Sequence, residues 1–221
     1  MKKINTLKGM LFAVSAMFAL TTVASAGPLN NVYLEVGGSA VGAIAEGSSN
    51  DAQSATTTGA VGKTATTADY GIGFMSNRDR KMGFDIGYIV TPGQAKISHT
   101  SDSATATKVS LDISDMTQYY IAPMINITED ASIYVKFAQN STDLTVVGDV
   151  NKISSMDGDT IAVGTVMSWG SNLYMRTEAG QTEYDTLKFT GLGTAGGVLT
   201  TETITVTPKV NYGRVALGYK F

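Results

Sequence analysis

The sequence contains no cysteine, one histidine, one tryptophan and four prolines among 221 residues. Without cysteine the chain has no disulfide framework, no thiolate metal site and no residue for lipid attachment behind a signal peptide. After residue 20 no apolar run approaches the roughly 20 residues that a membrane-spanning helix requires. These absences argue against a disulfide scaffold, a zinc-thiolate protein and a helical membrane protein.

Basic residues are also scarce outside the N-terminus. Three of the 16 Lys and Arg residues, and none of the 19 Asp and Glu residues, lie in the first 26 positions, so 13 basic and 19 acidic residues remain, a formal charge of −6. Nucleic-acid phosphates attract basic surfaces, so we expect no nucleic-acid partner. The 24 glycines, the many Thr, Ser and Val residues and the 43% hydrophobic content fit β structure with many turns.

The first 26 residues have the pattern of a secretory signal peptide. Lys2, Lys3 and Lys8 form a positive segment, an apolar stretch runs from Met10 to Leu20, and Ala24-Ser25-Ala26 provides small residues at a cleavage site. The sequence therefore predicts a signal peptide over 1–26 and one exported domain over 27–221.

A two-residue periodicity runs through the rest of the chain and predicts eight strands. We expect them near 30–45, 67–76, 81–92, 110–125, 131–142, 155–169, 172–186 and 205–221. Three connections are short (77–80, 126–130 and 170–171), and the other four (46–66, 93–109, 143–154 and 187–204) are long and rich in Ser, Thr, Gly and Ala. Short turns at one end and long loops at the other predict an all-β fold, an eight-stranded antiparallel up-and-down transmembrane β-barrel. Closure would leave no sheet edge unpaired in hydrocarbon.

The parity of residues along each strand predicts which side chains face lipid and which face the interior. The outward set is apolar and includes Tyr70, Ile72, Met82, Ile86, Tyr88, Val90, Ile133, Val135, Phe137, Ile161, Val163 and Met167. Phe74, Phe84 and Trp169 lie near the turn end and predict an aromatic girdle at the membrane interface. The inward set is charged: Glu35, Asp69, Asp85, Lys136, Arg176, Glu178 and Arg214. We expect these seven to pair as a lumen charge network, since an isolated buried charge loses its hydration without compensation.

The last segment, Val215 to Phe221, alternates apolar and small or charged residues and ends on an aromatic residue. It resembles the closing strand of outer-membrane β-barrels, and this resemblance implies that Tyr219 and Phe221 signal to the barrel-assembly machinery. The whole chain resembles the small eight-stranded outer-membrane proteins of the OmpA-barrel, OmpX and opacity-protein type. The resemblance implies a monomer in the outer membrane of a Gram-negative-type bacterium, with periplasmic termini and with membrane lipid and lipopolysaccharide as its surroundings.

Three short motifs resemble known binding or catalytic patterns. Gly191 to Gly196 matches the G-x-G-x-x-G pattern but lacks the following helix that dinucleotide binding requires, so we interpret it as loop. Asp157-Gly158-Asp159 indicates a turn, because the further ligands of a calcium loop are missing. His99, with Ser101 and Asp102, suggests a hydrolase, but no third group is evident to hold the base. The sequence therefore predicts no enzyme, no metal and no cofactor.

Two functions are compatible with these residues. Eight strands enclose a bore that side chains can fill, so the first hypothesis is a structural or surface-interaction barrel with a largely plugged lumen. The alternative is a narrow passive channel for small solutes or ions, similar to OmpW, which would need an apolar lining that opens sideways. Parity indicates a charged interior, which favours the first hypothesis.

Overall fold

The structure, a computed structural model, describes residues 30–50, 56–76, 81–99, 109–147, 151–170, 172–195 and 198–221. The predicted signal peptide, 1–26, lies outside these residues. Among the described residues, no helix is long and apolar enough to cross a membrane.

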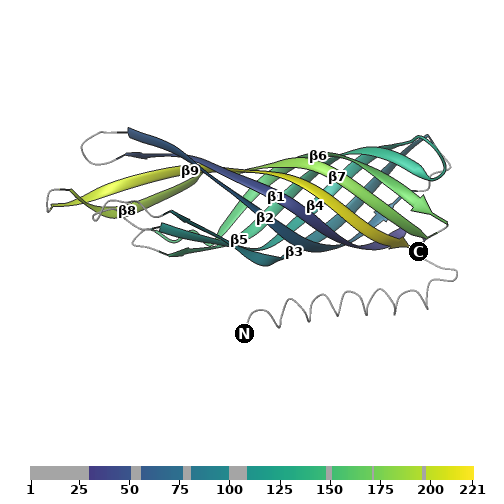
Figure 1. Ribbon diagram of the computed structural model, residues 1–221, viewed down its shortest axis with the longest axis horizontal. Helices are drawn as coiled ribbons and strands as arrows, with labels where there is room; N and C mark the ends of the chain where they lie inside the picture. The colour runs from purple at the N-terminus through teal and green to yellow at the C-terminus, as the bar shows by residue number, and fades with distance from the viewer. Residues whose placement is uncertain are drawn as a thin grey trace, which may run out of the picture.

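The described residues form an antiparallel β-barrel. Its strands are β1 (Val32–Asn50), β2 (Thr56–Met75), β3 (Met82–His99), β4 (Val109–Asn126), β5 (Ala131–Val147), β6 (Ser155–Trp169), β7 (Leu173–Tyr184), β8 (Leu187–Ala195) and β9 (Val198–Lys220). In this part of the chain β1 to β7 and β9 close the barrel, because β1 pairs with both β2 and β9 (Figure 1). Among the described strands, β8 has β9 as its one partner and pairs with the part of β9 from Val198 to Val206. The predicted eight-stranded transmembrane-type barrel is confirmed.

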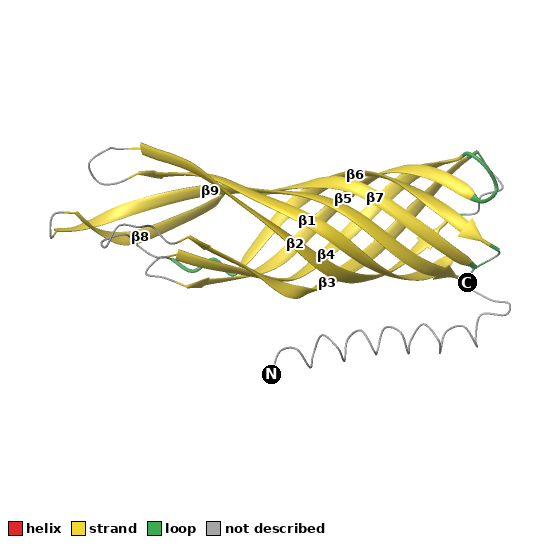
Figure 2. Cartoon of the chain, viewed as in Figure 1, coloured by secondary structure: helices red, strands yellow, loops and turns green. Residues whose placement is uncertain are grey.

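The first and last described residues of the chain meet at one end of the barrel, where Figure 2 marks the C-terminus. The Asn31 amide donates to the Phe221 carbonyl at 3.0 Å, and the Phe221 amide donates to the Val32 carbonyl at 2.9 Å. The connection of residues 127–130 between β4 and β5 lies at the same end. We call this the turn end and the opposite one the loop end.

Alternation of buried and exposed residues shows how the sequence builds the wall. On β5, Tyr134 and Lys136 are buried, whereas Ile133 and Phe137 are 43% and 49% exposed. Successive side chains of a strand point to opposite faces, so the polar set fills the interior and the apolar set covers the outside. In a soluble barrel the apolar side chains face the interior, whereas here they face outward, as in barrels surrounded by lipid.

The strands extend further toward the loop end than the sequence predicted. β1 continues to Asn50 and β2 begins at Thr56, although 46–66 was expected to be loop. The segment 187–204, also expected to be loop, contains β8 and the start of β9. The physical reason is that Thr and Val are β-branched residues that favour strands; their abundance outweighs the glycines in these segments.

The turn expected at Asp157-Gly158-Asp159 was also wrong, because these residues lie inside β6. Gly158 pairs with Tyr184 of β7. A Cβ at position 158 would lie 2.7 Å from Cδ1 of Tyr184. The glycine therefore makes room for a neighbouring ring and does not mark a turn.

The hydrogen-bonded pairing of the barrel wall is interrupted where β2 and β3 separate. Their pairing runs only from Met75–Asp85 to Tyr70–Val90. Two residues further along β3, Pro92 has no amide to donate, and Gly93 follows with a φ of 152°. β3 and β4 also carry irregularities at this height, and bulges of this kind bend strands and increase their twist. From Thr56 to Asp69, β2 pairs with β1, and from Thr91 to His99, β3 pairs with β4; the described residues show no β2–β3 pairing there.

Candidate functional site

The interior contains a chain of ion pairs that crosses the bore. Arg176 lies 2.6 Å from Asp85 Oδ2 through Nη2 and 3.2 Å from Glu35 Oε2 through Nε. Arg214 Nη2 lies 2.9 Å from Glu35 Oε1 and 2.5 Å from Asp69 Oδ1. Glu35 thus joins the two guanidinium groups. In an eight-stranded ring, β7 and β3 stand opposite each other, so the Arg176–Asp85 pair spans the barrel.

A second buried pair lies on the side of β5 and β7. Lys136 binds Glu178 and also donates to Gln118 Oε1 at 2.8 Å. The Tyr134 and Tyr212 hydroxyls donate to Glu178 at 2.7 and 2.6 Å. Glu178 therefore has a cation and two hydroxyls, which compensates the hydration that a buried carboxylate loses.

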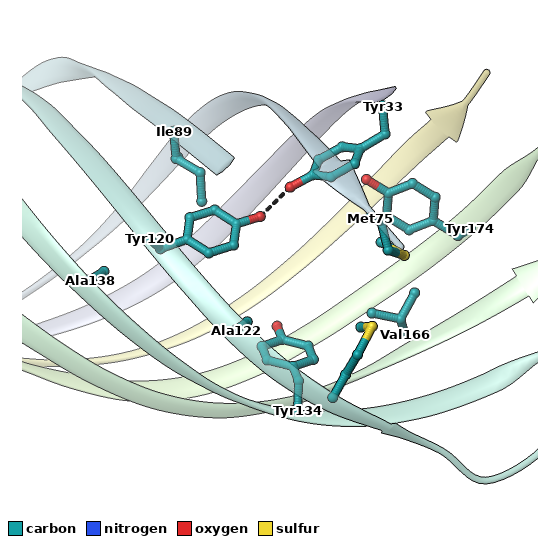
Figure 3. Close-up of a cluster of buried hydrophobic side chains, with 10 residues drawn as sticks. Tyr33, Met75, Ile89, Tyr120, Ala122, Tyr134, Ala138, Val166 and Tyr174 are labelled. Atoms are coloured by element: carbon teal, nitrogen blue, oxygen red, sulfur yellow. Dashed lines mark hydrogen bonds between the residues drawn. The ribbon is translucent and has the colours of Figure 1, made fainter. Parts of the chain in front are cut away.

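Tyrosines surround the Arg176 guanidinium. The rings of Tyr33, Tyr120, Tyr134 and Tyr174 have centroids 5.3 to 5.9 Å from its Cζ. Figure 3 shows these four rings converging from different strands, with a hydrogen bond between the Tyr33 and Tyr120 hydroxyls. Tyr33 also donates to Asp85 Oδ1 at 2.9 Å. The rings add cation–π attraction to the ion pairs and fill the volume around them.

Glycines on neighbouring strands give these rings their space. A Cβ at Gly87 would lie 2.7 Å from three atoms of Tyr120, and one at Gly180 would lie 2.8 Å from the Tyr212 ring and hydroxyl. A larger residue at either position would displace the ring. The packing of the interior therefore depends on glycine opposite tyrosine.

All seven residues of the predicted lumen charge network lie in the interior, each no more than 5% exposed. They are Glu35, Asp69, Asp85, Lys136, Arg176, Glu178 and Arg214. Every one forms an ion pair with another member. The structure thus brings the whole set together as one five-residue chain and one separate pair.

Sequence reasoning missed the interior tyrosines, although a signal was present. Four of them stand two residues before a network charge and share its face: Tyr33 before Glu35, Tyr134 before Lys136, Tyr174 before Arg176 and Tyr212 before Arg214. Parity would have placed these four rings beside the charges.

Toward the loop end the interior is largely apolar, whereas parity had indicated a charged interior. The cluster consists of Leu144, Val146, Met156, Tyr184, Leu187 and Phe189, with Ile113, Ile153, Ile204, Val206 and Val210 packed against it. Leu144, Val146, Leu187 and Phe189 were missed because 143–154 and 187–204 were expected to be loops. Ile113 was assigned to the wrong face because the irregularity between Ser114 and Thr117 in β4 changes which residues face inward.

The outer surface carries an apolar belt. On β6 it runs from Trp169 to Ile161, and the exposed carboxylates begin at Asp159. At about 3.4 Å per residue and a tilt of about 40°, the belt is roughly 20 Å high, near the roughly 25 Å of outer-membrane barrels.

The predicted girdle residues lie at the turn end of this belt. Phe74 and Phe84 stack at 5.9 Å between centroids, and Trp169 is 53% exposed. Tyr219 and Phe221 contact edge to face at 5.1 Å beside the β1–β9 seam. A third aromatic contact lies nearer the loop end, where the ring centroids of Tyr88 and Tyr119 are 4.6 Å apart.

The remaining motifs fall in or beside strands. Gly191 to Ala195 belong to β8, and Gly196 lies outside the described residues, so the interpretation of this motif as loop was wrong. His99 is the last residue of β3, whereas Ser101 and Asp102 lie outside the described residues. Within the described ranges, no group of three or more His, Asp or Glu side chains could hold a metal ion.

Comparisons with known proteins bear on the architecture. The sequence matches no protein-family model and no curated protein. Among solved structures, the chain is similar to Ail of Yersinia pestis bound to the heparin analogue sucrose octasulfate (13% identity, 84% of this chain, 99% of Ail, TM-score 0.43). It is similar to OprG of Pseudomonas aeruginosa (11% identity, 88% and 98% covered, TM-score 0.47) and to AlkL studied in lipid bilayers (15% identity, 90% and 95% covered, TM-score 0.47).

The chain is a small eight-stranded barrel of the outer-membrane type. Its own strand closure, inward charges and outward apolar belt show this. The resemblance expected from the sequence is thereby confirmed at the level of the fold. The similarities to solved structures have low identity, so they carry no information about the activity of this chain.

Proposed function

We propose that the protein is a non-enzymatic component of the outer membrane, with a lumen closed by side chains and a role in structure or surface interaction. The belt of exposed Ile, Phe and Val residues supports insertion into a bilayer. We place the termini on the periplasmic side and the long strand extensions outside, as short turns face the periplasm in such barrels.

One observation carries the proposal: the Arg176–Asp85 ion pair crosses the bore at 2.6 Å with both side chains buried. A water-filled channel at this depth would have to separate the two groups. Separation would leave each charge in a confined space without its partner, which is costly. The mostly apolar cluster at the loop end adds a second layer of packed side chains.

Liposome swelling tests the closed lumen. Proteoliposomes containing the refolded protein should show no more swelling in arabinose than protein-free liposomes, while a general porin in parallel liposomes should swell rapidly. Cell fractionation and heat-dependent migration on SDS gels test the location. Swelling comparable to that of the porin would contradict the closed lumen, and recovery as a soluble protein without detergent would contradict the membrane location.

A second candidate function, passage of small apolar molecules, has two observations in its favour. The loop-end interior is lined by Leu144, Val146 and Phe189, and in the described residues the β2–β3 pairing ends at Tyr70, on the side of the barrel opposite β6 and β7. An apolar molecule could enter from outside and leave sideways above the ion pairs without crossing them.

Binding of an apolar fluorescent probe separates the two functions. In lipid nanodiscs, 1-N-phenylnaphthylamine should bind with a saturable signal that octane displaces and that Leu144→Arg removes if this route exists. Lys209→Ala, an exposed change outside the cluster, is the control. Equal signals from wild type, Leu144→Arg and empty nanodiscs would exclude the second function.

A further inference from the structure

The wall beside the loop-end cluster has a junction between β6 and β8 that side-chain contacts close. β6 begins at Ser155 and pairs with β7 as far as Gly158–Tyr184, where β7 ends. β8 then continues the wall and pairs with β9. In the part of the chain that the structure describes, no ladder joins β8 to β6. The segment 151–154, which leads into β6, binds β8 at this junction instead.

Asn151 makes three hydrogen bonds to β8. Its backbone amide donates to the Thr190 carbonyl at 3.0 Å, and the Thr190 amide donates to Asn151 Oδ1 at 2.6 Å. Asn151 Nδ2 donates to the Lys188 carbonyl at 3.4 Å. One amide side chain thus supplies the acceptor and the donor that a neighbouring strand would supply. All three residues are exposed, so water can replace these bonds when they open. We call the three bonds the Asn151 clasp.

The same segment also contacts the apolar interior. Ile153 is half-buried and packs against the loop-end cluster. The Leu144 amide donates to the Ser154 carbonyl at 2.9 Å, and Leu144 is itself a residue of the cluster, 6% exposed. Segment 151–154 therefore connects the edge of β8 with the apolar interior, and a movement of this segment would disturb both.

The β6–β8 junction lies beyond the apolar belt. Along β6, the exposed carboxylates of Asp157 and Asp159 stand between segment 151–154 and Ile161, the last apolar residue of the belt. Carboxylates are costly to place in hydrocarbon, so the junction faces water. An opening there would connect the loop-end cluster with the aqueous side of the barrel and not with the lipid.

We infer that segment 151–154 is a strap that opens at the Asn151 clasp and controls the access of small apolar molecules to the loop-end cluster. Local opening requires the least free energy where hydrogen bonds are exposed and buried apolar contacts are few. The clasp consists of exposed bonds, and Ile153 is the strap residue that packs against the cluster. This inference rests on the second candidate function, the passage of apolar molecules, and assigns its entry.

Hydrogen exchange at the Leu144 amide tests the opening, in the full mature protein in lipid nanodiscs. Asn151→Ala removes both side-chain bonds of the clasp and leaves Leu144 itself unchanged. Each such bond contributes about a factor of five, so exchange at Leu144 should become about twentyfold faster. The matched control is Asn211→Ala, which removes another exposed asparagine that accepts a bond from Gln181 and should leave the Leu144 rate unchanged. Equal Leu144 rates in Asn151→Ala and the wild type would overturn the proposal.

A reversible crosslink tests the access. The chain has no cysteine, so Asn151→Cys combined with Thr190→Cys gives one defined disulfide. Neighbouring extended segments lie about 4.8 Å apart, within the Cα separations that a disulfide spans. The reduced protein should bind 1-N-phenylnaphthylamine in nanodiscs, and oxidation should abolish the fast phase of binding. The wild type treated with the same oxidant should not change. Equal binding rates before and after crosslinking would overturn the access role, because the probe would then enter by another route.

The two experiments separate this inference from the function on which it rests. If the reduced protein binds no probe, the second candidate function fails and the access role fails with it. Exchange at Leu144 does not depend on any ligand, so it still decides whether the strap opens at the clasp. If the probe binds at one rate in both redox forms, the second candidate function stands and the strap is not its entry.

Discussion

Replacing Arg176 by alanine should destabilise the barrel more than any single exposed substitution. The change removes the cation between Asp85 and Glu35. Glu35 keeps Arg214 at 2.9 Å, but Asp85 keeps only the Tyr33 and Tyr120 hydroxyls, at 2.9 and 3.2 Å. Breaking one side of a buried pair costs about 3–5 kcal/mol, so we expect the free energy of unfolding to fall by about that amount.

The assay is equilibrium unfolding in guanidinium chloride from lipid vesicles, followed by the fluorescence of Trp169, the single tryptophan. The matched control is Lys209→Ala, which breaks an ion pair whose partners are 41% and 59% exposed; solvent screens such pairs, so the loss should be small. Adding Asp85→Asn to Arg176→Ala should restore part of the stability, because a neutral amide leaves no unpaired charge. If Arg176→Ala loses no more stability than Lys209→Ala, the interior is hydrated and the buried ion pairs do not hold the barrel.

Three further changes test the packing, the assembly signal and the loop-end cluster. Gly87→Ala should cost about 1–3 kcal/mol by displacing Tyr120, whereas Gly213→Ala, with nothing within 4 Å of its Cβ, should be neutral; equal unfolding curves for the two would contradict the role of glycine opposite tyrosine. Deleting Phe221 should reduce membrane-inserted yield in cells far more than refolding into detergent, since burial of one ring contributes only about 2 kcal/mol; equal losses in both assays would count against an assembly signal. Phe189→Ala should lower stability by about 3 kcal/mol and expose the β8–β9 hairpin to protease, and unchanged digestion would show that the loop-end cluster does not hold the hairpin.

Much of the fold could be predicted because a barrel wall repeats one simple rule. Ile133, Val135 and Phe137 alternate with Tyr134 and Lys136, and this parity alone places the lipid and interior faces of β5. The same alternation predicts that the seven charged residues of the lumen network face the interior. It could not supply the pairing, since Arg176 and Asp85 are brought together by closure of the ring and not by proximity in sequence.

The rule failed where the backbone departs from regular alternation. Beyond the irregularity at Ser114 to Thr117, parity counted from the turn end assigns the wrong face to Ile113. Threonine was a second cause of error. In 56–66 and 198–204 it was interpreted as a loop residue by its polarity, whereas its branched Cβ favours the extended conformation found there.

Single-channel recording in planar bilayers tests the closed lumen most directly. The wild-type protein should give no long-lived conductance steps, because the Arg176–Asp85 pair and the loop-end cluster occupy the bore at two heights. Large and long-lived steps from the wild type, unchanged in Arg176→Ala, would show an aqueous path through the interior and contradict a lumen closed by side chains.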